Sequence, residues 1–174
     1  WVRVQPGVVQ DQLNSYLEPL GFGFGPDTSS SSRATIGGMI GNNSAGSHSI
    51  MYGKTIDHVL ELKAVLSDGS EVVLDPAEGS VLGVRARADS FEGHLYRDLL
   101  ALGDRWRDEI LARYPKLMRR VSGYNLDELI VNPEGGFGAG YSSLPGPFNL
   151  ARMIVGSEGT LAVVSEAKVR IVPL

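Results

Sequence analysis

The segment TIGGMIGNNSAGSHS, residues 35–49, is the feature that most limits what this chain can fold into. It holds four glycines among small polar residues and only three large apolar side chains. Such a segment adds little to a core, but glycine lets backbone approach a ligand closely and adopt positive φ. We therefore predict an exposed ribbon of backbone whose N–H groups can point at the negatively charged oxygens of a polar, planar or phosphorylated ligand.

The composition excludes several classes of protein. A chain of 174 residues with 43% hydrophobic and 21% charged residues is typical of a globular fold of one domain or two small lobes. No apolar run is long enough to cross a bilayer. A net charge of -4 argues against nucleic-acid binding, and the lack of cysteine excludes disulfides and thiolate metal sites. Cytoplasm is then the default compartment, with membrane association through partners as an open alternative.

The first half of the chain predicts a strand, a helix and a hairpin. Valines at the start favour a short strand, and Leu13, Leu17 and Leu20 recur at helical spacing before Gly21. Residues 21–32 are rich in glycine and serine and predict a loop. Alternating apolar residues over 57–66, the turn SDGS and a second strand over 71–74 predict the hairpin.

The second half predicts one long helix, a loop and a closing strand. Ser90 can cap a helix whose apolar stripe includes Leu95, Trp106 and Ile110, and which reaches about Tyr114. Residues 132–147 are rich in glycine and proline, which predicts an exposed excursion. Because strands and helices mix without strict alternation, we predict an α+β fold.

Other sites find little support in the residue spacing. The lysine of Gly53–Lys54–Thr55 lacks the upstream glycine of a phosphate-binding P-loop. The histidines do not have zinc-site spacing, so we predict no metal, and we expect His58 and His94 to lie at the surface. No second carboxylate pairs with Glu158 at a fixed spacing, so we assign no catalytic residue.

Four motifs in order make a family resemblance specific. They are ProAspThr at 26–28, TIGGMIGNNSAG at 35–46, SerGlyTyrAsnLeu at 122–126 and MetIleValGlySerGluGlyThr at 153–160. Together they resemble the FAD-linked oxidases of the vanillyl-alcohol-oxidase and p-cresol-methylhydroxylase (PCMH) type. The likeness is strongest to the branch of D-lactate, glycolate and D-2-hydroxyglutarate dehydrogenases, and it covers nearly the whole chain.

The resemblance implies an FAD-binding type-2 (PCMH-like) domain, mainly its second lobe, with a mixed or antiparallel sheet flanked by helices. Residues 1–25 would be the remnant of an incomplete first lobe, and 26–174 the second lobe with a Gly/Pro-rich insertion at 132–147. The family's pyrophosphate loop and substrate-binding cap are absent from this sequence. We therefore expect a piece of a longer protein that retains FAD weakly or not at all on its own.

The resemblance also implies which residues line the cofactor, with backbone amides of small residues bonding the flavin and valine side chains offering apolar surface to a ring. His48 would lie near the flavin, where it either satisfies loop backbone or hosts a covalent link. The residues expected to contact FAD are Pro26, Asp27, Thr28, Thr35, Ile36, Gly37, Gly38, Asn42, Asn43, Ser44, Ala45, Gly46, Glu158, Gly159, Thr160, Leu161, Ala162, Val163 and Val164.

The function that this implies is the FAD-binding part of a dehydrogenase or oxidase. It would convert a D-2-hydroxy acid of the lactate, glycolate or 2-hydroxyglutarate type to the 2-oxo acid. Its implied partners are the substrate, held by the cap domain, and an iron–sulfur domain or another electron acceptor. Two alternatives stay open: another oxidoreductase on the same scaffold, such as an enolpyruvyl-sugar reductase or an alcohol oxidase, and a folded fragment that binds no FAD.

Overall fold

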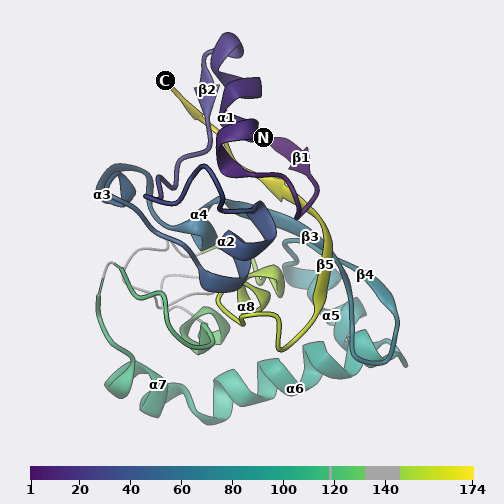
Figure 1. The fold of residues 1–174 in the computed structure, drawn as a ribbon. Coiled ribbons are helices and arrows are strands. Elements are labelled where there is room, and N and C mark those ends of the chain that lie inside the picture. The colour runs from purple at the N-terminus through teal and green to yellow at the C-terminus, as the bar shows by residue number, and fades with distance from the viewer. Residues whose placement is uncertain (118, 132–145) are drawn as a thin grey trace.

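A computed structural model describes residues 1–117, 119–131 and 146–174. At its centre is a four-stranded sheet in the order β1-β5-β3-β4 (Figure 1). Its strands are β1 (Val2–Val4), β5 (Val163–Val169), β3 (Val59–Val65) and β4 (Glu71–Leu74), and every neighbouring pair is antiparallel. A second sheet pairs β2 (Phe22–Gly23) with β6 (Val172–Pro173). The predicted α+β class with an antiparallel sheet is confirmed, as is the hairpin of β3 and β4.

The two faces of the central sheet follow the two-residue period of the sequence. Leu62 and Ala167 are paired across β3 and β5, and both are fully buried in the core. On the other face Arg3 of β1 contacts Glu61 of β3 at 2.7 Å and Glu166 of β5 at 2.9 Å. One face therefore packs against helices while the other carries a ladder of ion pairs.

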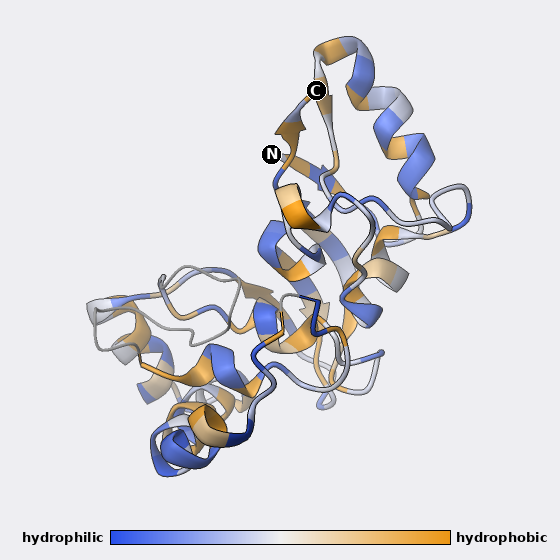
Figure 2. Ribbon diagram, turned by 90° about the vertical axis from the view of Figure 1, so that its left-hand side faces the viewer, coloured by the Kyte–Doolittle hydropathy of each residue, from blue (hydrophilic) through white to orange (hydrophobic). Residues whose placement is uncertain are grey.

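The helices lie around this sheet (Figures 1 and 2). In Figure 1, α6 and α7 run along one end of the molecule, α1 with β2 stands at the other, and α2 lies between them. Figure 2 shows the same separation from the side, with hydrophilic and hydrophobic residues alternating along the helices. The helices are α1 (Gln10–Leu17), α2 (Ile36–Asn42), α3 (Ser49–Tyr52), α4 (Thr55–His58), α5 (Gly79–Arg87), α6 (Phe91–Arg105), α7 (Arg107–Arg113) and α8 (Ala151–Ile154), with 3-10 turns η1 (Glu18–Leu20) and η2 (Leu126–Leu129).

The predicted helix near the start is confirmed as α1 followed by η1. Leu13 and Leu17 are buried, whereas Leu20 is 62% exposed because η1 has turned away from the core. Gly21 ends the helical segment in the left-handed region at φ 79°, a conformation that costs glycine little.

The prediction of one long helix over 90–114 is correct at the start of the helix and wrong in its middle, where the helix is broken. Ser90 Oγ accepts a hydrogen bond from Gly93 N, which is the expected cap of α6. The helix breaks at Trp106, whose φ of -106° and ψ of 14° leave the helical region. The break turns α7 so that Ile110 is buried while Trp106 is 50% exposed. The aromatic residue that α6 buries is Tyr96, which the predicted stripe did not include.

Three further expectations are corrected. Residues 36–42 are helical, whereas the glycine segment was expected to be an exposed ribbon. Helix α5 precedes Ser90, where no helix was predicted. His58 is 2% exposed rather than at the surface, since both ring nitrogens contact backbone carbonyls, Nδ1 that of Arg170 and Nε2 that of Tyr52. The predicted excursion at 132–147 falls almost wholly outside the described residues, while His94 is exposed as expected.

Candidate functional site

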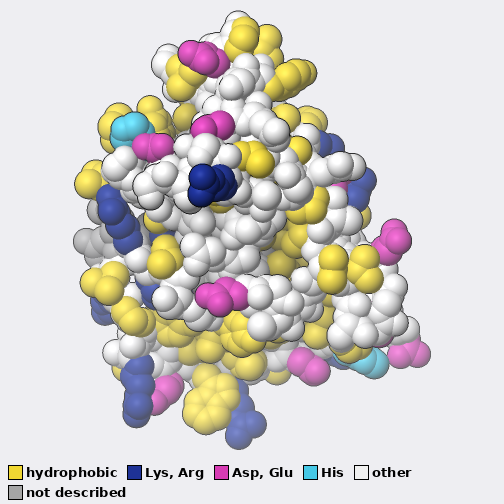
Figure 3. All heavy atoms as spheres, viewed as in Figure 1, with side chains coloured by type: hydrophobic (Ala, Val, Ile, Leu, Met, Phe, Trp, Pro, Cys, Tyr) yellow, Lys and Arg dark blue, Asp and Glu magenta, His cyan; other side chains and the backbone are white. Residues whose placement is uncertain are grey.

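Helix α2 is built so that it buries its large side chains and leaves its glycines toward the surface. Thr35 caps it, with Oγ1 accepting from Gly38 N at 3.1 Å. Ile36, Met39 and Ile40 are almost completely buried. In Figure 3 the middle of the face over α2 is mostly white, the colour of backbone and small polar residues. The expectation of a side-chain-poor surface is confirmed.

The expected free amides are not found at the start of this helix. Ile36 N donates to Val8 O, Gly37 N to Pro6 O, both at 2.8 Å, and Gly38 N is held by the Thr35 cap. A Cβ on Gly37 would lie 2.7 Å from Pro6 Cβ. Glycine therefore serves close packing of backbone on backbone here, and the first turn of α2 has no spare donors for an anion.

The two glycine-rich segments meet at the other end of α2. Gly156 N donates to Ile40 O and Glu158 N donates to Gly41 O, each at 2.9 Å. These carbonyls belong to the last turn of α2, where helix carbonyls have no partner within the helix. Segments separated by more than a hundred residues thus share backbone hydrogen bonds. Their proximity agrees with the resemblance, which implies that both segments line one cofactor.

A pocket of about 270 Å³ lies where they meet. None of its lining side chains is charged, and Ser157 contributes the one polar side chain. The pocket is lined by Pro6, Gly37, Ile40, Gly41, Ile154, Ser157, Gly159, Ala162, Val163 and Val164. A neutral, largely apolar pocket of this kind suits a flat ring better than a phosphate.

Ser157 is the unusual polar group of this pocket. It is 3% exposed, and its Oγ has no hydrogen-bond partner within the described part of the chain. Buried hydroxyls are nearly always paired, so this group is an exception among the buried polar atoms, but its Oγ has almost no accessible surface and is therefore not exposed to the pocket.

The turn that carries Ser157 has an unusual backbone. Gly156 and Gly159 have φ of 83° and 77°, and Glu158 between them has φ of 52°. A non-glycine residue in the left-handed region costs of order 1 kcal/mol and persists when its surroundings fix it. The hydrogen bonds to α2 supply that constraint.

Replacing Glu158 with glycine should relieve this strain. We expect Glu158→Gly to stabilise the chain by about 1 kcal/mol, since glycine adopts positive φ without a Cβ clash. Glu158→Ala is the control, because it removes the carboxylate but keeps the β-carbon, and it should give no gain. Urea unfolding measures both, and equal stability of the two variants would contradict the assignment of strain.

The predicted residues 26–28 lie against a different part of the glycine segment. A Cβ on Gly46 would fall on the carbonyl oxygen of Asp27, so the two backbones are in direct contact. The Asp27 carboxylate accepts from Ser47 Oγ at 3.0 Å and lies 3.2 Å from His48 Nδ1. Pro26 O and Thr28 Oγ1 both bond to the buried side chain of Gln10.

A second cavity of about 260 Å³ adjoins this contact. Asp27, His48 and Tyr52 line one part of it, and apolar residues that include Phe22 and Leu174 line another. His48 is thus paired with a carboxylate, whereas the sequence analysis expected it to satisfy loop backbone or approach a flavin.

The other predicted residues divide between structural and surface positions. Asn43 is buried and ends α2 at φ 48°, while Ser44 O accepts from Thr55 N and Oγ1. Asn42 and Leu161 are exposed, and Ala45 is half-buried. Thr160 Oγ1 bonds to the hydroxyl of Tyr124, which brings the SerGlyTyrAsnLeu motif to the same turn.

Sequence reasoning missed four kinds of contributor to the pocket: Pro6, the helix residues Ile40 and Gly41, Ile154, and the Ser157 hydroxyl. The helical spacing of Gly37 and Gly41 could have placed Gly41 on the face of Gly37. Pro6 could not be found, because its contact depends on the path of residues far apart in the sequence.

The described residues contain no group of three or more acidic or histidine side chains that could hold a metal ion, and no helix among them is long and apolar enough to cross a membrane.

Comparisons with known proteins bear on this geometry. Residues 1–75 match the model of a family described as an FAD binding domain. Over its full length the chain is 42% identical to the D-2-hydroxyglutarate dehydrogenase of Pantoea ananatis and 37% identical to that of Escherichia coli K12, and it covers 16% of each. It is 29% identical to the glycolate oxidase subunit GlcD of Bacillus subtilis, with 98% of this chain and 23% of the relative covered.

Residues 1–75 thus match an FAD binding domain, and the chain is similar over its full length to hydroxy-acid dehydrogenases. The predicted family and its hydroxy-acid dehydrogenase branch are thereby confirmed, and the family's cofactor is FAD. The chain spans about a sixth of the length of the dehydrogenases it matches.

The fold of the chain is also found among solved structures. Two structures of alkyldihydroxyacetonephosphate synthase superpose with TM-scores of 0.51 and 0.52 at 18% identity. They cover 98% and 99% of this chain, which itself covers 19% of each.

Proposed function

We propose that this chain forms part of the FAD site in a dehydrogenase that oxidises a D-2-hydroxy acid. The convergence of α2 with the turn at 156–159 around a neutral pocket carries the proposal. In an FAD-linked oxidase this is a surface on which an elongated dinucleotide can lie, because bare backbone allows close approach.

The pocket fits an uncharged, planar part of FAD. Its apolar walls match a ring system, and none of its lining side chains is charged. We propose that Gly37, Gly159 and the residues 162–164 hold this part of the cofactor.

The remaining predicted contacts continue the surface along the glycine segment. We propose that residues 42–46 lead from the pocket toward residues 26–28, whose backbone touches Gly46. Thr35, Ile36 and Gly38 act through the shape of α2, since the amides of Ile36 and Gly38 are already bonded within the chain and the Thr35 hydroxyl caps the helix.

The substrate that we propose is D-2-hydroxyglutarate. Its support is that relatives matched over the whole chain at 37–42% identity carry that name, whereas GlcD is 29% identical. A bound flavin supplies a two-electron acceptor for hydride from the hydroxyl-bearing carbon. A sugar reductase or an alcohol oxidase on the same scaffold is the competing activity, and hydroxy-acid turnover by the full-length protein separates them.

The substrate-binding region, the electron acceptor, the cellular location and the division into lobes are also proposals. We propose that a cap region outside these residues binds the hydroxy acid and that an iron–sulfur domain or another acceptor takes the electrons. We also propose a cytoplasmic location and a division into a first-lobe portion at 1–25 and a second-lobe portion at 26–174.

An equilibrium titration tests the cofactor site, because it detects weak binding that a column would lose. A Cβ on Gly41 would lie 3.7 Å from Glu158 Cα, an ordinary contact, so Gly41→Ala should fold while its methyl group occupies pocket space. We expect wild-type chain to quench FAD fluorescence and Gly41→Ala to bind at least about tenfold more weakly, equivalent to about 1.4 kcal/mol.

Gly83→Ala is the matched control, because Gly83 is also helical, lies in α5 and does not line the pocket. It should leave FAD binding unchanged. The proposal fails if the full-length protein shows no FAD binding in the same titration, or if Gly41→Ala binds FAD as well as wild type.

A further inference from the structure

We propose that Asn125 is a positioning residue for the pocket: its side chain holds the turn at 156–159 in the strained conformation that closes the pocket against α2. The inference rests on the proposed function, since it concerns the wall of that same site. Asn125 itself does not line the pocket, so it acts through the turn rather than on the ligand.

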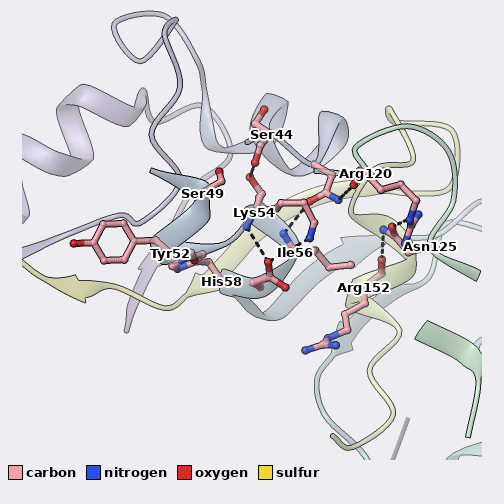
Figure 4. Close-up of polar contacts among 12 residues, drawn as sticks. Ser44, Ser49, Tyr52, Lys54, Ile56, His58, Arg120, Asn125 and Arg152 are labelled. Atoms are coloured by element: carbon pink, nitrogen blue, oxygen red, sulfur yellow. Dashed lines mark hydrogen bonds and ion pairs between the residues drawn. The ribbon is translucent and has the colours of Figure 1, made fainter. Parts of the chain in front are cut away.

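The Asn125 carboxamide bonds to the segment that enters the turn. It is 1% exposed, and its Nδ2 donates to Val155 O at 2.6 Å. The same Nδ2 donates to Arg152 O at 3.1 Å (Figure 4). Its Oδ1 accepts from Arg120 Nη1 at 3.1 Å. Val155 immediately precedes Gly156, so the carboxamide fixes the chain just where it enters the left-handed turn.

The chemistry of this position calls for an amide side chain. Two carbonyl oxygens need two N–H donors, and the arginine needs an acceptor on the same side chain. Asparagine supplies both, whereas aspartate offers acceptors only and leucine offers neither.

A second contact joins the same cluster to α2. Asn43, which ends α2, donates from Nδ2 to Arg120 O at 3.5 Å and accepts at Oδ1 from Ile56 N at 3.0 Å. A Cβ on Gly156 would lie 3.5 Å from both Asn125 Nδ2 and Asn43 Cβ. Gly156 at the start of the turn thus lies against both asparagines.

The turn needs such anchors because its backbone conformation is unfavourable by itself. Strained residues persist only where the surroundings over-determine them. The anchors at the turn include the two hydrogen bonds to α2, the Asn125 bond to Val155 O and the bonds from Thr160 to Ser157 O. Loss of the Asn125 donor should let the turn open locally, which exposes the amides of Gly156 and Glu158.

Asn149 provides a matched control from the same chain. It is also buried, and its Nδ2 donates to Leu60 O at 3.1 Å while its Oδ1 accepts from Ala151 N at 3.0 Å. It joins the start of α8 to β3 and does not contact the turn. Replacing Asn149 removes buried hydrogen bonds of the same kind as replacing Asn125, but leaves the contacts of the turn in place.

The test compares Asn125→Asp with Asn149→Asp, using Asn125→Ser if the first does not fold. Without FAD, hydrogen exchange at the amides of Gly156 and Glu158 should become about tenfold faster or more in Asn125→Asp, and change little in Asn149→Asp. FAD should bind Asn125→Asp about tenfold more weakly or worse at a matched folded fraction, and bind Asn149→Asp like wild type.

Glu158→Gly supplies a rescue that a purely structural role would not produce. By removing strain it lets the turn stay formed with fewer anchors, so adding it to Asn125→Asp should restore protection at Gly156. Unchanged exchange in Asn125→Asp, or faster exchange with undiminished FAD affinity, would overturn the inference. If Asn125→Asp exchanges faster but the full-length wild-type protein binds no FAD, the proposed function is wrong. The role of Asn125 in holding the turn is then still supported.

Discussion

Gly46→Ala should destabilise the chain by about 3 kcal/mol or more, at the upper end of what overpacking costs. A β-carbon at this position would coincide with the carbonyl oxygen of Asp27, which is backbone and cannot rotate away. One of the two segments must therefore move, and the Ser47–Asp27 hydrogen bond would be lost with it. Urea unfolding followed by circular dichroism measures the loss.

Gly7→Ala is the control for this substitution. A Cβ on Gly7 would meet nothing within 4 Å, so the folded chain can accept it. The change should be neutral or stabilise the chain by up to about 1 kcal/mol, because alanine lowers the conformational entropy of the unfolded state. If Gly46→Ala and Gly7→Ala unfold at the same urea concentration, the close approach of residues 27 and 46 is wrong.

Arg120→Met should cost about 3–5 kcal/mol near neutral pH, because it leaves a buried carboxylate unpaired. Arg120 Nη2 donates to Oδ1 and Oδ2 of Asp127 at 2.6 and 2.7 Å, and the Asp127 side chain is 5% exposed. The same guanidinium lies 4.6 Å from the centre of the Tyr114 ring and bonds to Asn125. Removing it opens the cluster beneath the pocket.

The cost of Arg120→Met should depend on pH in a defined direction. Burial raises the pKa of Asp127 above its ordinary value, and Arg120 opposes that rise. Without the arginine the pKa rises further, so folding favours the protonated acid, and the stability present at low pH is lost as pH rises through the folded pKa. The deficit should be largest at about pH 7.5 and smaller at about pH 5.

Arg113→Met controls for the loss of a charge and an ion pair. Arg113 Nε lies 2.5 Å from Glu109 Oε1, but both side chains are largely exposed, so this pair should contribute less than about 1 kcal/mol. A deficit for Arg120→Met that is no larger than that of Arg113→Met, or that grows on acidification, would show that Asp127 is not held as a buried ion.

The sequence predicted those parts of the fold that local pattern controls. The hairpin followed from two-residue alternation and a turn signal, and the cap at Ser90 from residue type and spacing. The break at Trp106 could not be read in this way, because an apolar stripe continues through it without a breaker. The break depends on where η2 crosses α6: a Cβ on Gly103 would lie 2.5 Å from Leu129 O.

The sequence analysis predicted which segments form the candidate site, but not the secondary structure and hydrogen bonds that bring them together. The sequence indicated that the segments around Gly37 and Gly159 lie together, and the pocket contains both. It did not predict that α2 would be helical, since three glycines within seven residues disfavour a helix. Tertiary bonds from Pro6, Gly156 and Glu158 outweigh that preference, and such bonds leave no local signature.

The most direct test of the account is an NMR titration of isotope-labelled chain with FAD, recording the backbone amides of α2 and of residues 156–164. If the two segments form one cofactor surface, Gly37 and Gly41 should shift together with Gly159 and Val163 and saturate at a single FAD concentration. Shifts confined to one segment, or found only elsewhere in the chain, would contradict a shared site.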